Sequence, residues 1–230
     1  MAPRDALAEY RRRRDFSKSR EPAGRGEEGG ASAGSTPEGG GTPESGGASF
    51  VVQIHDASTL HFDFRLEADG VLKSWAVPKG PSDDPHDKRL AMPTEDHPLD
   101  YRAFEGAITR GEYGAGTVIV WDEGTYENLT ADRRGRPLTL AEGVGRGHVS
   151  FRLAGRKLHG GYSLTRFRGS GDEEGGREAW LLVKRADAQA GRHPTPDPHR
   201  ARSALSGRTL GQMQAAAEAG EAATWTRTTD

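Results

Sequence analysis

Residues 61–67 place the tightest limit on what this chain can fold into, because apolar and polar side chains alternate along them without a break. A period of two puts successive side chains on opposite faces of a β-strand. Asp69-Gly70 follows, and this dipeptide favours a type I′ turn, which needs positive φ at both central positions. The pattern predicts a β-hairpin in which Phe64 lies opposite Trp75.

The same hairpin has one apolar face and one polar face. The apolar face carries Phe62, Phe64 and Leu66, and the polar face carries His61, Asp63, Arg65 and Glu67. The register set by the turn places two small residues, Ser74 and Ala76, opposite Arg65 and Asp63. Small partners leave room above the row of polar side chains.

Short apolar runs separated by Gly, Pro, Asp and Asn continue along the chain as far as residue 185, with almost no helical periodicity. Many short strands at regular spacing are typical of a barrel or sandwich. We therefore expect an all-β domain over residues 50–185, folded as a compact antiparallel β-barrel. The expected strands are residues 50–55, 60–67, 71–77, 117–121, 148–153, 162–167 and 180–184.

The segments on either side of this domain differ from it in composition. Residues 1–21 form a short charged arm with a basic end. Residues 22–49 hold ten glycines and three prolines and no large apolar side chain, which predicts a flexible linker. Residues 186–230 read as a mostly disordered tail, with one helix over residues 210–223 whose apolar stripe is too narrow to dock firmly.

Charge and cysteine content exclude several classes of protein. A formal net charge of −2 does not fit a protein that coats nucleic acid, and the lack of cysteine excludes disulfides, thiolate nucleophiles and Cys-based zinc sites. Neither a membrane span nor a secretory signal is expected, and a reducing cytoplasm fits the cysteine-free sequence.

A candidate metal site comes from the polar rows of two neighbouring strands. If the rows share a space, His55, His61 and Asp63 converge as two imidazoles and a carboxylate, a ligand set that suits Mn²⁺, Zn²⁺, Fe²⁺ or Co²⁺. Arg65 would then lie beside the cation, and its forked donors suit a phosphate. The alternative is a solvated strand face, which the pattern alone favours by about two to one.

Two further segments are open to a functional and to a plain structural interpretation. Glu95, His97 and Tyr101 form a polar cluster that fits phosphate contacts or a solvated acidic turn. Residues 104–116 are rich in glycine but do not form a dinucleotide-binding pattern, so we expect a bulged turn leading into a strand.

Taken together, several motifs carry a resemblance to a known family. They are FVVQIHDASTLHFDFRLEADGVLKSWAVPKGPS, KRLAM, TEDHPLDY, FEGAITRGEYGAGTVIVWDEGTYE and WLLVKR, and a fainter match covers YRRRRDF and REP. With these motifs the chain resembles the 3′-phosphoesterase module of bacterial DNA ligase D over residues 50–185.

The resemblance implies a β-barrel enzyme that heals DNA 3′ ends for end-joining repair with a divalent metal, typically Mn²⁺. Such an enzyme removes a 3′-terminal ribonucleotide and then the remaining 3′-phosphate, leaving a 3′-OH end for a DNA ligase and other end-joining proteins. The implied metal ligands are His55, His61 and Asp63. The implied catalytic set is Arg65, His97 and Tyr101 at the scissile phosphate, Glu95 as a supporting acid, and Arg14, Asp15 and Glu21 in the arm.

Two other functions remain open from the residues. The first is a non-catalytic module that binds nucleic-acid 3′ ends and assists a ligase. The second is a metal-dependent hydrolase of small phosphoesters. No K-x-D-G adenylation motif occurs in the sequence, so we expect a stand-alone phosphoesterase or a fragment.

Overall fold

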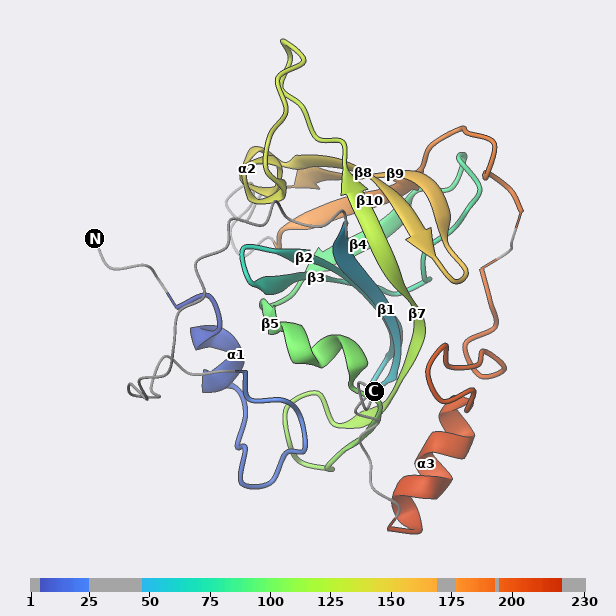
Figure 1. Ribbon diagram of the computed structural model, residues 1–230. Coiled ribbons are helices and arrows are strands. Elements are labelled where there is room, and N and C mark those ends of the chain that lie inside the picture. The colour runs from blue at the N-terminus through green and yellow to red at the C-terminus, as the bar shows by residue number, and fades with distance from the viewer. Residues whose placement is uncertain (1–4, 25–46, 169–176, 193–194, 221–230) are drawn as a thin grey trace, which may run out of the picture.

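A computed structural model describes residues 5–24, 47–168, 177–192 and 195–220 (Figure 1). Strands dominate these residues. The strands are β1 (Ala48–Asp56), β2 (Leu60–Ala68), β3 (Val71–Val77), β4 (Arg89–Pro93), β5 (His97–Pro98), β6 (Gly106–Ile108), β7 (Gly116–Asn128), β8 (His148–Gly155), β9 (His159–Arg168) and β10 (Ala179–Lys184). The helices are α1 (Ala8–Arg12), the 3₁₀-helix η1 (Leu99–Ala103), α2 (Leu140–Arg146) and α3 (Leu210–Glu218).

Eight antiparallel strands close into a barrel in the order β1-β2-β3-β4-β10-β9-β8-β7, and β7 returns to pair with β1. Closure removes the free sheet edges that would otherwise invite aggregation. β5 pairs with β3 and β6 with β7, outside this ring. The prediction of a compact antiparallel β-barrel is confirmed.

The β2–β3 hairpin has the predicted register. Phe64 lies opposite Trp75 and Arg65 opposite Ser74. Asp69 has φ 51° and Gly70 has φ 77°, as a type I′ turn requires. The alternation of residues 61–67 and this turn therefore determine which side chains share a face.

Two apolar clusters lie on the two faces of β1 and β7. The larger one draws on every strand of the closed ring and fills the barrel interior, with Phe64, Trp75 and Trp180 among its members. The second, here the outer cluster, lies on the outside of the barrel. Its members are Leu7, Tyr10, Val51, Val71, Leu72, Tyr101, Phe104, Ile108, Val118 and Val120.

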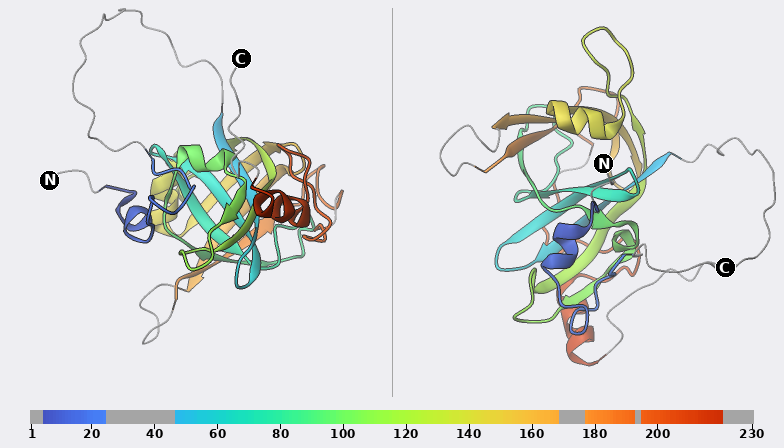
Figure 2. Two further views of the ribbon diagram at one scale, coloured as in Figure 1. Left: turned by 90° about the horizontal axis from the view of Figure 1, so that it is seen from below. Right: turned by 90° about the vertical axis from the view of Figure 1, so that its left-hand side faces the viewer.

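The N-terminal arm and η1 cover the outer face of β1, β2 and β3. Tyr10 of α1 is fully buried there, and its ring meets the ring of Tyr101 of η1 edge-on at 6.1 Å. α1 and η1 lie next to each other on one side of the barrel (Figure 1 and Figure 2). The polar row of β2 is therefore covered, and the alternative of a solvated strand face is wrong.

Several element boundaries differ from the sequence-based expectation. The short strands β4, β5 and β6 were not predicted, because two to five residues show too little periodicity. β7 runs to Asn128 rather than to residue 121, because its second half pairs with β8. β1 begins at Ala48, inside the expected linker, of which residues 25–46 lie outside the described part of the chain.

The predicted C-terminal helix is confirmed within the described residues as α3, but the expectation that it would not dock firmly is wrong. α3 packs against β6 and β7, and Leu210 and Met213 are each only 3% exposed within the interior cluster. Two well-placed apolar side chains at i and i+3 were enough to dock a short helix, although its stripe is narrow. None of the described helices is long and apolar enough to cross a membrane.

Met213→Ala is expected to lower the free energy of unfolding by about 2–4 kcal/mol, because it leaves a cavity under a docked helix. Gln214→Ala, at an exposed position of the same helix, is the matched control and should change stability by less than about 0.5 kcal/mol. Urea unfolding measures both. Equal stability of the two variants would mean that α3 does not dock.

Candidate active site

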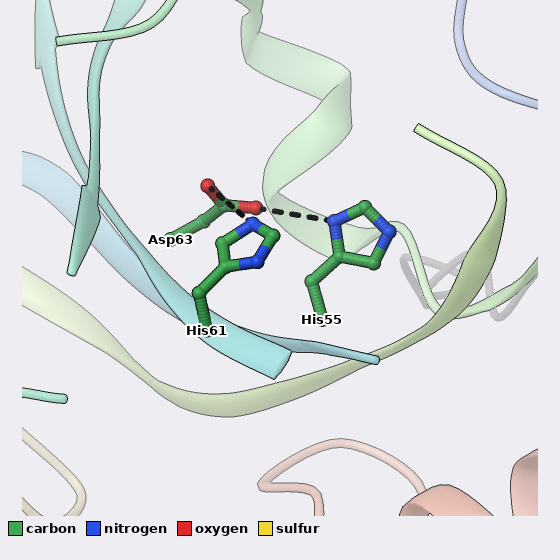
Figure 3. Close-up of side chains that lie close together, drawn as sticks. All are labelled: His55, His61 and Asp63. Carbon is green, nitrogen blue, oxygen red and sulfur yellow. Dashed lines mark ion pairs between the residues drawn. The ribbon is translucent and has the colours of Figure 1, made fainter. Parts of the chain in front are cut away.

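The three candidate metal ligands lie together on the outer face of β1 and β2. His55 lies opposite His61 in the β1–β2 register, and Asp63 follows two residues later on the same face. One ligand atom from each residue lies within 4.8 Å of the others. Figure 3 shows the three side chains close together, with dashed lines that join the Asp63 carboxylate to both imidazoles.

Backbone carbonyls set the tautomer of both histidines. His55 Nε2 lies 2.8 Å from the carbonyl oxygen of Gly114, and His61 Nδ1 lies 2.7 Å from that of Thr59. Because a carbonyl oxygen only accepts, each of these nitrogens is assigned the proton. The lone pairs then belong to His55 Nδ1 and His61 Nε2, the two nitrogens that face Asp63.

This donor set fits a divalent cation. His55 Nδ1 and His61 Nε2 each lie 3.7 Å from a carboxylate oxygen of Asp63, so two lone pairs and an anionic group face one another. A cation between them would be bound by all three groups, and a carbonyl at the far nitrogen of each imidazole is the usual second partner of a metal-binding histidine. Two imidazoles and one carboxylate also leave coordination positions open for substrate.

Arg65 lies directly behind the triad and is almost completely buried. Its guanidinium donates to Asp63 at 3.0 Å, to Gln53 at 2.9 Å and to Ser74 at 2.8 Å. Burial raises the pKa of Asp63, but the opposing effects, of which the charge of Arg65 is the largest, hold that pKa well below its usual value. Asp63 is therefore an anion at any physiological pH.

A second group of side chains adjoins Arg65 and joins the arm to the barrel. Arg14 donates to Glu21 and to Glu95, each at 2.9 Å, and its Nη2 lies 3.4 Å from Nε2 of His97. Tyr101 donates its hydroxyl proton to Glu21 at 3.0 Å. All of these side chains are buried, so the site is an ordered network rather than a solvated surface.

His97 is neutral in this network. Its Nδ1 donates to the carbonyl oxygen of Glu95 at 2.8 Å, which leaves the lone pair on Nε2. Burial, with Arg65 and Arg14 nearby, lowers the pKa of His97 well below its usual value. Burial also raises the pKa of the Tyr101 hydroxyl well above its usual value, so this group keeps its proton.

Neutral His97 makes stability depend on pH in a defined direction. The unfolded chain takes up a proton near pH 6.5, but folded His97 does so only at lower pH, so its contribution is present above pH 6.5 and is lost as pH falls. We expect the free energy of unfolding to fall by about 1 kcal/mol per pH unit below pH 6, and this slope should be smaller in His97→Gln. Urea midpoints at pH 7.5 and 5.0 test this, and equal slopes would contradict it.

Asp15 is the one predicted site residue that does not join the cluster. Its side chain is exposed and accepts hydrogen bonds from Ser17, and it pairs with Lys18 at 3.2 Å. It caps a turn of the arm instead. The structure brings the other nine predicted residues together, from β1, β2, β5, η1, the segment before β5 and the arm.

Sequence reasoning did not identify several groups that support the site. Gln53 and Ser74 hold Arg65, Tyr10 packs its ring against the guanidinium of Arg14 at 3.8 Å, and the Gly114 carbonyl orients His55. Gln53 lies two positions before His55 on the polar face of β1, which was an available signal. The contact of His55 with the Gly114 carbonyl had no such signal, because the pattern of residue types does not indicate where a backbone carbonyl of a loop will lie.

Comparison with known proteins supports one family. The family described as "DNA Ligase D 3′-phosphoesterase domain" matches residues 53–166. The multifunctional non-homologous end joining protein LigD of Pseudomonas aeruginosa is 47% identical over 184 residues, which cover 80% of this chain and 19% of that protein. LigD proteins of Mycobacterium tuberculosis and Mycolicibacterium smegmatis are 45% and 39% identical, each over 72% of this chain.

The chain spans about a fifth of the length of these relatives. The matched region contains β2 and β3 and all three candidate metal ligands. On the fold, the site and these similarities, the chain belongs to the family of the DNA ligase D 3′-phosphoesterase domain.

Proposed function

We propose that this protein is a metal-dependent phosphoesterase that heals DNA 3′ ends. It removes a 3′-terminal ribonucleotide, then the 3′-phosphate that remains, and leaves a 3′-OH end. The observation that carries this proposal is the position of Arg65, whose guanidinium lies 3.0 Å from the carboxylate of Asp63. Asp63 is one of three candidate metal ligands, and a cation bound by these three would keep coordination positions open for substrate. A phosphate at those positions would meet the arginine as well.

The charges of the site support a cation-dependent phosphate site. Arg13, Arg14 and Arg65 bring three positive charges, and the carboxylates of Asp63, Glu21 and Glu95 bring three negative ones. These side chains together carry no net positive charge that would attract a phosphate. A divalent cation supplies that charge, so binding of the DNA end should depend on the metal.

Arg65 is suited to hold the scissile phosphate. Three of its five N–H groups are donated to Asp63, Gln53 and Ser74, which fix the plane of the guanidinium. We assign the remaining donors to a phosphoryl oxygen of the substrate. A fixed guanidinium stabilises the negative charge that grows on the phosphoryl group in the transition state.

His97 is suited to accept a proton rather than to donate one. Its lone pair is on Nε2, and its lowered pKa keeps the ring neutral. It can take the proton of an attacking 2′-OH or water. A divalent cation held by His55, His61 and Asp63, of which we propose Mn²⁺, would stabilise charge on the phosphoryl oxygens.

Membership of the family supports a proposal for the substrates and partners. The relatives are named as end-joining proteins, and a 3′-OH end is the form that a ligase can seal. We therefore propose DNA primer–template ends, terminated by a ribonucleotide or a 3′-phosphate, as substrates. A DNA ligase and other end-joining proteins would use the product.

A gel assay tests the proposal. A 5′-labelled primer–template with one terminal ribonucleotide is incubated with the protein and Mn²⁺, Zn²⁺, Co²⁺ or Mg²⁺, with a chelator as control. We expect shortening to a 3′-phosphate and then to a 3′-OH, abolished by the chelator. Equal hydrolysis of a nucleotide monophosphate would favour a small-phosphoester hydrolase. Binding without turnover under every metal would favour an end-binding module.

A further inference from the structure

An aromatic ring lies exposed at the rim of the active site. Tyr113 belongs to the glycine-rich loop between β6 and β7 and is 45% exposed, which is unusual for so large a side chain in this fold. The other large exposed apolar residues of the described chain are Leu90 on β4 and Phe167 on β9. Around the barrel, two strands separate β9 from β1 and three separate it from β2.

The loop places Tyr113 next to the candidate metal ligands. The next residue, Gly114, offers its carbonyl oxygen to His55 Nε2 at 2.8 Å. Gly114 has φ 75°, a conformation that glycine adopts without strain, so the loop can bring this carbonyl to the histidine. The backbone of Tyr113 is thus held next to the triad.

The hydroxyl of Tyr113 connects the same residue to the buried network of Glu95, Arg14 and His97. It accepts a hydrogen bond from Nη1 of Arg13, and this nitrogen also lies 3.4 Å from a carboxylate oxygen of Glu95. Glu95 in turn accepts a hydrogen bond from Arg14, whose Nη2 lies 3.4 Å from Nε2 of His97. The ring therefore spans the rim between the metal triad and the buried cluster around His97.

Arginines hold the ring without burying it. The guanidinium of Arg13 lies 4.9 Å from the ring centroid and that of Arg14 lies 5.5 Å from it. Arg13 is itself anchored by Glu9 at 2.5 Å. Cation–π contacts of this kind orient an aromatic ring while much of it stays open to solvent.

We propose that Tyr113 is the stacking platform for the base of the 3′-terminal nucleotide, with Arg13 as the residue that positions its ring. A fixed, exposed aromatic side chain next to a phosphate site is the feature that proteins use to stack unpaired bases. Stacking tolerates every base, because each has a π face. The location of the DNA end rests on the proposed function, but base stacking by this ring is a separate property.

Base stacking predicts a specific pattern among substitutions of Tyr113. Tyr113→Ala should weaken binding of a DNA 3′ end about tenfold or more. Tyr113→Phe keeps the ring and should stay within about twofold of the unchanged protein. Tyr113→Leu keeps apolar volume without an aromatic face and should behave like Tyr113→Ala.

A fluorescence measurement tests stacking without turnover. A primer–template carries 2-aminopurine as its 3′-terminal base and ends in a 3′-OH, which the proposed reaction cannot process further. It is titrated with the protein and Zn²⁺, a diamagnetic cation that suits two histidines and a carboxylate. We expect binding to quench the fluorescence with Tyr or Phe at position 113, and not with Ala or Leu.

Two controls separate stacking from other roles. Phe167→Ala removes an equally exposed aromatic ring on β9 and should change neither affinity nor quenching. Moving 2-aminopurine five nucleotides inward should abolish the quenching. If Tyr113→Phe fails as completely as Tyr113→Ala, the hydroxyl contact with Arg13 is what matters and the platform is excluded.

Failure of this inference can be told apart from failure of the proposed function. Turnover of ribonucleotide ends by the unchanged protein, with Tyr113→Ala at unchanged affinity and quenching, would exclude the platform alone. Ring-dependent quenching without turnover under any metal would exclude the phosphoesterase and support the platform. A protein that does not bind DNA ends at all would overturn both.

Discussion

His61→Ala is expected to reduce metal-dependent turnover of 3′ ends by at least about a thousandfold. The cation supplies several kcal/mol of charge stabilisation, and about 4 kcal/mol corresponds to that factor. His61 contributes one of only two imidazole lone pairs in the triad, and the remaining His55 and Asp63 cannot hold the cation in the same geometry. The His61 side chain is 21% exposed, so its loss should leave the fold intact.

The matched control for this prediction is His86→Ala. His86 is 93% exposed and pairs with Asp84 outside the site, so its removal should change turnover less than twofold. Calorimetric titration with Mn²⁺ measures the metal affinity of both variants, and the labelled primer–template measures their turnover. Unchanged turnover in His61→Ala, with metal still bound, would show that the cation is held elsewhere.

The β2–β3 hairpin shows how far the sequence alone could lead. Strict alternation and one turn dipeptide predicted which residues oppose one another, because a turn of defined type leaves a single register. The same alternation predicted that His61, Asp63 and Arg65 share a face of β2, whereas convergence with His55 was expected only if the polar rows of two strands shared a space. The part of the site on β2 was therefore predictable from spacing, and the pairing of β1 with β2 adds His55 to it.

The covering of that face was not predictable in the same way. Arg14 and Glu21 reach the site from an arm that is separated from β1 by residues 25–46, and no pattern in a glycine-rich stretch says where the arm docks. Their inclusion came from family resemblance. Burial of the polar row depends on this docking, which explains why spacing alone favoured a solvated face.

Docking of the C-terminal helix was not predicted for a related reason. Its composition is dominated by Ala, Arg, Pro and Thr, which signals low hydrophobicity on average. Docking depended on a few buried side chains, namely Ala201, Leu210 and Met213, rather than on average composition. Local hydrophobic contacts of this kind are visible only once the barrel supplies the surface that they meet.

Arg65→Met is expected to destabilise the metal-free protein by about 3–5 kcal/mol and to abolish detectable turnover. Removing Arg65 leaves the buried carboxylate of Asp63 without its nearest counter-charge, and an unpaired buried charge is costly. It also removes the donors that we assign to the scissile phosphate. Urea unfolding in the presence of a chelator measures the loss of stability.

Arg65→Lys separates the two roles of this residue. A lysine restores positive charge near Asp63 but lacks the planar fork that reaches Gln53, Ser74 and a phosphate at once. We expect it to recover most of the stability while turnover stays at least about a hundredfold reduced. Turnover close to that of the unchanged protein would mean that charge alone suffices.

Addition of a divalent cation should raise the melting temperature of Arg65→Met more than that of the unchanged protein. In the variant, the cation would be the nearest positive charge to Asp63, so its binding would also remove the cost of an unpaired buried carboxylate. In the unchanged protein Arg65 already compensates that charge. The rise in melting temperature on adding Zn²⁺ should therefore be larger in Arg65→Met. An equal rise would mean that Arg65 and the cation do not interact with the same carboxylate, Asp63. The proposal that Asp63 connects the metal site to the phosphate-binding Arg65 would then be wrong.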